Sequence, residues 1–265
     1  MFPRHARLSD GARLRRRHRF YTHLLLVTLF VLVCLALPSN LHSLAGVGYS
    51  LATLLMMAEL EGTIRHGGKV NPRDLPYRLL GVLCLLAQWF WYLTPLSQRQ
   101  SGWPLLVLTT LFVSWSVVRL VAFLAEERSV NGRVLMGAIS GYLLLGLTAG
   151  LLFTGLETIQ PGSFSSLHDP EMPLFPSGPI ADATPLGRVL DFSRMNYFAF
   201  VCLTTVGFGD VLPMTPPAQI STVAFSVIGP IYMAVVMGML IGRYASGNNG
   251  RAAEREDPPD GGRLG

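Results

Sequence analysis

The chain has 265 residues, half of them hydrophobic and only 14% charged. Its mean hydropathy of +0.42 is higher than a soluble core needs, so the composition favours an all-α integral membrane protein. The formal net charge is +5, but the basic residues flank apolar segments and do not gather in one patch, which argues against a nucleic-acid partner.

Six apolar runs predict six transmembrane helices. About 20 helical residues, each rising 1.5 Å, cross a hydrocarbon core of about 30 Å, and each run is close to that length or longer. The runs are Phe20–Leu37, Leu41–Ala58, Leu79–Leu96, Trp103–Ala125, Val134–Leu156 and Ala218–Gly242. A cleaved signal peptide is the alternative for the first run, but that run is long for a signal core.

Lysine and arginine are concentrated on one side of this topology. They precede the first run, join the second run to the third and the fourth to the fifth, and follow the sixth. Because basic loops stay in the cytoplasm, we predict that both termini are cytoplasmic, with a basic segment at 1–19 and a disordered polar tail at 244–265. The absence of long cytoplasmic segments favours a prokaryotic plasma membrane.

A proline-rich stretch, residues 157–187, is predicted to be an exposed loop on the outer side. His168, Asp169 and Glu171 could together hold a divalent ion, but the prolines keep the backbone open and favour a solvated loop without a metal. The cysteines Cys34, Cys84 and Cys202 all lie in apolar segments, which indicates core residues and neither a disulfide framework nor a metal site.

Asp191–Leu203, with the sequence DFSRMNYFAFVCL, is predicted to be a short helix with Asp191 capping its first turn. About 13 residues make a helix of about 20 Å, which is too short to cross. The helix must therefore enter from the outer side and stop, and residues 204–210 must return the chain outward. Non-helical backbone at membrane depth is tolerated only where protein buries it or where it lines a water-filled path.

The returning segment, TTVGFGD, has a composition suited to binding a bare cation. Gly207 and Gly209 alternate with Val206 and Phe208, and glycine readily adopts left-handed backbone angles. Alternating left- and right-handed conformations can aim successive carbonyl oxygens in one direction. Several chains around an axis would then form stacked oxygen rings, to which the Thr205 hydroxyl adds one more.

The same segment resembles the selectivity-filter signature of potassium channels. Phe208 stands where tyrosine is usual, Asp210 matches the acidic residue that follows the signature, and Tyr197 and Phe198 fall where the family places aromatic packing residues. The carboxyl end of the short helix, near Thr204, carries about half a negative charge, which favours a cation. The resemblance implies K+ coordination by Thr205, Val206, Gly207 and Phe208, with Gly209 completing the filter.

The resemblance extends over Val134 to Gly242, within a predicted pore domain of residues 133–243. The stretch VIGPIYMAVVMGMLIG resembles the pore-lining inner helix, with Gly229 at a hinge-like position and Pro230 favouring a kink. Close packing is the alternative role for Gly229. The fifth run is rich in small residues, which predicts tight helix contacts at Gly137, Gly141, Gly146, Gly150 and Gly155.

The first four runs, within residues 20–125, resemble a voltage-sensor-like bundle only in number and topology. The fourth run carries Arg119 as its single arginine. Moving one charge contributes about 2.3 kcal/mol per 100 mV, so four subunits would supply at most roughly 9 kcal/mol, against the tens needed for steep gating. We therefore predict weak or no voltage dependence. Arg119 is expected to pair with Glu59, or alternatively to reach the inner headgroups.

Taken together, the resemblance implies a homotetrameric potassium channel in lipid, with K+ as the permeant ion and no cofactor. An electrically silent channel subunit and a potassium uptake transporter are the alternatives, although such transporters generally repeat the span, loop, span unit four times. No nucleophile elbow, metal-ligand helix motif or phosphate loop occurs, so an enzyme is not expected.

Overall fold

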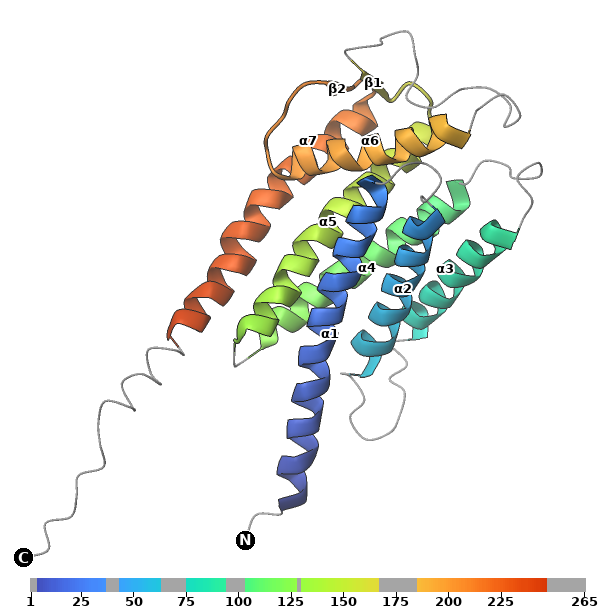
Figure 1. The fold of residues 1–265 in the computed structure, drawn as a ribbon. Coiled ribbons are helices and arrows are strands. Elements are labelled where there is room, and N and C mark those ends of the chain that lie inside the picture. Colours follow the sequence, from blue (N-terminus) through green and yellow to red (C-terminus); the bar gives the residue numbers. More distant parts are fainter. Residues whose placement is uncertain are drawn as a thin grey trace, which may run out of the picture.

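The computed structural model describes residues 4–36, 43–62, 75–93, 103–127, 130–166 and 185–246. Helices make up most of this part of the chain, together with a small two-stranded sheet (Figure 1). His168, Asp169 and Glu171 lie outside the described residues, as does the predicted tail beyond Ser246.

The first four helices pack together as one bundle. They are α1 (Arg4–Ala36), α2 (Ser43–Gly62), α3 (Leu75–Leu93) and α4 (Trp103–Glu126). Leu24 of α1, Met56 of α2 and Phe112 of α4 are fully buried in their shared core. The first helix begins well before the predicted run at Phe20, because the basic segment that precedes the run is itself helical.

Four helices in the described part of the chain are long and apolar enough to cross a membrane. Their apolar segments are Arg19–Ala36, Pro104–Ala125, Gly132–Ile159 and Pro216–Ser246. The apolar parts of α2 and α3, Gly46–Ala58 and Leu75–Phe90, are shorter. The architecture is therefore that of a helical membrane protein, and the second and third of the six predicted spans stay predictions.

The central helix is α5 (Gly132–Ile159), which packs against α1, α4, α6 and α7. Asn131 caps its first turn, because its side chain accepts hydrogen bonds from the Arg133 and Val134 N–H groups. Four of the five predicted packing glycines meet neighbours closely enough that a Cβ would overlap them, namely Gly137, Gly141, Gly146 and Gly150. A Cβ on Gly155 would meet nothing within 4 Å, so the packing prediction fails there.

The helix before the candidate segment, α6 (Pro185–Leu203), is longer than the sequence predicted. It has 19 residues, about 28 Å, and at this length the prediction that the helix is too short to cross no longer applies. It begins at Pro185, so Asp191 lies inside the helix and does not cap its start. Proline suits the first turn of a helix because its missing N–H has no partner there in any case. Helix α6 lies across the carboxyl end of α1 and across the second half of α5 (Figure 1), and Ser193 donates a hydrogen bond to the Leu35 carbonyl of α1 at 2.8 Å.

Two short strands and a long helix complete the described chain. Strand β1 (Phe164–Ser166) pairs antiparallel with β2 (Val211–Pro213), and Ser166 lies opposite Val211. The helix α7 (Pro216–Ile231) continues as a π-helical segment, η4 (Tyr232–Met237), and then as α-helix to residue 246. A second core of aromatic residues joins α5, β1, α6 and α7 through Phe153, Phe164, Phe198 and Phe225.

Candidate functional site

The chain reverses direction directly after α6, and the carbonyl groups at the end of that helix hold the reversal. The Thr205 N–H donates to the Cys202 carbonyl at 3.0 Å. The Val206 N–H donates to the Val201 carbonyl at 3.1 Å, and the Gly207 N–H approaches the same oxygen at 3.4 Å. These bonds satisfy carbonyls that the helix end would otherwise leave without partners, so residues 204–207 are attached to the end of α6.

The backbone of this segment alternates in a way that ordinary loops do not. The angle φ is 60° at Thr205, 60° at Gly207 and 75° at Gly209, whereas Val206 and Phe208 between them keep negative values. Gly207 and Gly209 were expected to adopt left-handed angles, and they do. Thr205 adopts one as well, which is an outlier for a β-branched residue.

Two predicted packing residues in α6 lie against the segment and against the second core. The Tyr197 ring stacks on Phe208, with ring centroids 6.4 Å apart and an interplanar angle of 3°. Phe198 is buried among the core aromatics. Partial desolvation, and then the neighbouring Asp210, raise the pKa of the Tyr197 phenol.

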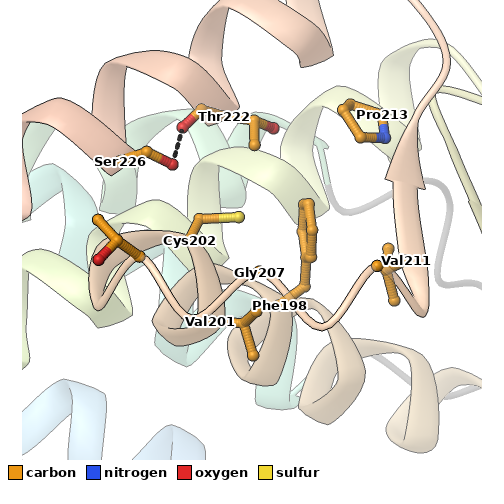
Figure 2. Close-up of a pocket in the computed structure, with 10 residues that line it drawn as sticks. Phe198, Val201, Cys202, Gly207, Val211, Pro213, Thr222 and Ser226 are labelled. Carbon is orange, nitrogen blue, oxygen red and sulfur yellow. Dashed lines mark hydrogen bonds between the residues drawn. The ribbon is translucent and has the colours of Figure 1, made fainter.

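A pocket of about 340 Å³ lies behind the segment, between α6 and α7. Figure 2 shows the Phe198 ring and the Cys202 thiol on the α6 side, with Thr222 and Ser226 of α7 opposite. Both hydroxyls donate to carbonyls of their own helix, to Ala218 from Thr222 and to Thr222 from Ser226. The Thr222 and Ser226 hydroxyls are therefore already hydrogen-bonded, and the pocket presents mainly apolar surface.

Gly229 of α7 lies directly against the carboxyl end of α6. A Cβ at this position would overlap the Leu203 carbonyl oxygen, which is a backbone atom that cannot move aside cheaply. The structure thus shows close packing at Gly229, and the hinge role of this residue stays a prediction. Pro230 lies inside α7, and the π-helical segment begins two residues later, as expected where a proline removes a backbone hydrogen bond.

Two tyrosines connect α5 with the end of α6 and with η4, and neither was predicted from the sequence. Tyr232 of η4 is buried, and its hydroxyl donates to the Ala138 carbonyl at 2.7 Å. The Tyr142 hydroxyl reaches the Leu203 carbonyl at 3.4 Å. A tyrosine in an apolar helix gives no sequence signal of which carbonyl it will meet, so neither contact was predictable from spacing.

The structure does not test the predicted Arg119–Glu59 pair, because the Glu59 side chain lies outside the described residues. The contact that the structure does show is with Tyr77, because the Arg119 guanidinium lies 4.5 Å from the centre of that ring. Tyr77 in turn shares a hydrogen bond of 2.8 Å with Ser116. Arg119 is therefore part of a contact between α3 and α4, far from residues 204–210 in the sequence.

Comparison with known proteins identifies the same part of the chain. Residues 178–245, about a quarter of the chain, match a protein-family model described as an ion channel. No curated protein matches the chain. The matched range contains α6, the alternating segment, β2 and α7 with η4. The family match and the apolar helices together support a membrane ion channel.

Proposed function

We propose that this chain is the subunit of a potassium-selective channel, which conducts K+ passively down its electrochemical gradient. The observation that carries the proposal is the positive φ at every second residue from Thr205 to Gly209. In the proposed filter, the carbonyl oxygens of residues 205–208 replace the hydration shell of a K+ ion. The family match over the same residues supports this assignment.

The strain at Thr205 supports a functional role for the segment over an ordinary turn. Holding a non-glycine residue in the left-handed region costs of the order of 1–3 kcal/mol, and such strain is concentrated at sites that use it. The Thr205 side chain is exposed in the single chain, so burial of that side chain does not repay the strain. We attribute the left-handed conformation of Thr205 to a ring of oxygen ligands, which several chains form around a shared axis.

A ring needs several copies, and we propose a homotetramer with fourfold symmetry. Each chain supplies one filter segment. Large apolar side chains on α7 are exposed in the single chain, and this face fits contact with neighbouring copies and with lipid. They include Ile220, Val223, Val227 and Ile231.

In the proposed topology, six helices cross a prokaryotic plasma membrane and both termini are cytoplasmic. Helix α6 enters from the outer side, and residues 204–210 return the chain to it. The contact of α6 with the carboxyl end of α1 and with the second half of α5 supports this arrangement (Figure 1). Because Arg119 is the single basic residue of α4, we propose weak or no voltage dependence.

Potassium flux from reconstituted vesicles tests the function. Vesicles loaded with K+ and diluted into Na+ should lose K+ through the wild-type protein, which a protonophore and a pH-sensitive dye report. Gly207→Ala places a Cβ at a left-handed angle, costing about 1–2 kcal/mol in each copy, and should abolish the selective flux.

Gly155→Ala is the matched control, since a Cβ there meets nothing within 4 Å and the residue is helical. It should leave the flux unchanged. Equal flux of K+ and Na+ through the wild-type protein, or selective flux that survives Gly207→Ala, would contradict the proposed filter. A wild-type protein that is folded but silent would favour a channel subunit that needs a different partner chain.

A further inference from the structure

A buried carboxylate holds the loop region beside the proposed filter. Glu157 lies near the end of α5 and is completely buried, at 0% exposure, so the prediction that an exposed loop begins at residue 157 is wrong. One oxygen, Oε1, accepts a hydrogen bond from the Gly162 N–H at 2.8 Å, and Oε2 accepts one from the Phe164 N–H at 2.9 Å. A buried acidic group is tolerated only when its oxygens are hydrogen-bonded, and both oxygens meet this condition here.

These two bonds fix the position at which β1 starts. Phe164 is the first residue of β1, and its side chain is buried between Phe153 of α5 and Phe198 of α6, with ring centroids 5.3 and 5.7 Å apart. Gly162 adopts a φ of +84°, which allows the turn to bring its N–H back to the carboxylate. The carboxylate therefore joins α5 to the strand through backbone groups alone.

The pairing of β1 with β2 connects this part of the chain to the candidate filter. Val211, the first residue of β2, follows Asp210 directly and lies opposite Ser166 of β1. The Met214 N–H also donates to the Ser163 carbonyl at 2.7 Å, just outside the strand pair. One pair of short strands thus separates the Glu157 carboxylate from the outer end of residues 204–210.

We propose that Glu157 is a positioning residue for ion selection, a role that rests on the function proposed above. Its carboxylate holds β1, and the pairing of β1 with β2 fixes the outer end of the filter. The site requires a carboxylate because two N–H groups need two acceptor oxygens. Glutamine has nearly the same shape but turns an NH2 group towards one of these donors, which leaves that donor unpaired.

The test compares Glu157→Gln with Thr158→Val in reconstituted channels. Thr158 is the neighbouring residue, and its hydroxyl bonds only within α5, to the Thr154 carbonyl. We expect Glu157→Gln to raise the Na+ to K+ permeability ratio about fivefold or more, since one buried donor loses its acceptor. Thr158→Val should stay within about twofold of wild type. Glu157→Asp keeps the charge but is one methylene too short to reach both N–H groups, and it should shift the ratio in the same direction by less.

A merely structural role makes a different prediction. If Glu157→Gln lowers the yield of folded protein but the protein that folds has the wild-type permeability ratio, the positioning role is wrong. If the glutamine variant does not fold, Glu157→Asp replaces it in this test. Folded Glu157→Asp protein with the wild-type permeability ratio would then show that the positioning role is wrong.

Hydrogen exchange of the backbone amides separates this inference from the function on which it rests. In Glu157→Gln, exchange should become faster at residues 162–166 and also at 211, 212 and 214, whether or not the protein conducts. A change confined to 162–164 would overturn the positioning role even in a selective channel. A wild-type protein without K+ selectivity, combined with faster exchange in both strands of the variant, would refute the proposed K+ filter. The structural link from Glu157 to the two strands would still hold.

Discussion

The bundle α1–α4 and the region from α5 to η4 are built from similarly apolar helices but pack by different means. In the bundle, large side chains fill the space between helices, as where Tyr77 stacks on Phe112 with centroids 5.2 Å apart. Between α6 and α7, a glycine lets one helix touch the backbone of the other, at Gly229 and the Leu203 carbonyl. Large side chains fill the cores of both regions, and the region around residues 204–210 depends in addition on backbone position.

The largest expected effect comes from breaking the backbone contact. Gly229→Ala places a methyl group on the Leu203 carbonyl oxygen, so α7 must move away from α6. Overpacking of this kind costs about 1–3 kcal/mol in each copy, and the displaced residue adjoins the start of the candidate filter. We expect loss of K+ flux, measured in vesicles, together with a lower thermal midpoint of the purified protein.

Gly238→Ala is the control for that variant in the same long helix. The nearest atom to a Cβ at Gly238 is the Met233 carbonyl oxygen at 4.0 Å, so the methyl group fits. Flux should be unchanged, and the thermal midpoint unchanged or higher, since alanine is a better helix former than glycine. Equal effects of the two variants would show that backbone proximity is not what distinguishes this region.

A smaller effect is expected within the bundle. Arg119→Gln removes the contact of the guanidinium with the Tyr77 ring, which is worth about 0.5–2 kcal/mol. The thermal midpoint should fall, whereas the permeability ratio should not change, because the contact lies between α3 and α4. Thermal unfolding of the purified protein checks the first expectation, and single-channel recording over a range of voltages checks the second. A large change in voltage dependence or selectivity would contradict the separation of the two regions.

The smallest effect should come from the contact that joins the end of the long inner helix to α4. Arg243 donates hydrogen bonds from Nη1 to the Ala125 carbonyl at 3.1 Å and the Glu127 carbonyl at 3.2 Å, at the carboxyl end of α4. A cation at a helix carboxyl end is worth about 0.3–1 kcal/mol. Arg243→Gln should therefore change the open probability by a factor of about two to five, with Arg243→Lys closer to wild type. An unchanged open probability in Arg243→Gln would show that this contact does not influence opening.

The sequence predicted the break at 204–210 because glycines and polar residues interrupt an apolar chain. It predicted left-handed angles at Gly207 and Gly209 for the same reason, since glycine alone adopts them freely. The angle at Thr205 was not predictable, because a β-branched residue disfavours it and only the surrounding structure holds it there. Local composition therefore predicts permissive positions but not strained ones.

Contacts between distant residues were the other part that the sequence could not supply. The start of α6 was placed too late because Asp191 resembles a cap, whereas Pro185 begins the helix. The partners of Glu157 are backbone N–H groups, which every residue except proline carries, so no pattern of side chains marks them. Helical periodicity likewise indicates which face of α4 is buried, but not that Arg119 meets Tyr77.

The reversal potential of the wild-type protein tests the central claim most directly. The purified chain is reconstituted into a planar bilayer with K+ on one side and Na+ on the other, and the current is recorded as the voltage is varied. The proposed filter predicts a reversal close to the potassium equilibrium potential. A reversal near zero under these opposed gradients would show that residues 204–210 do not select K+.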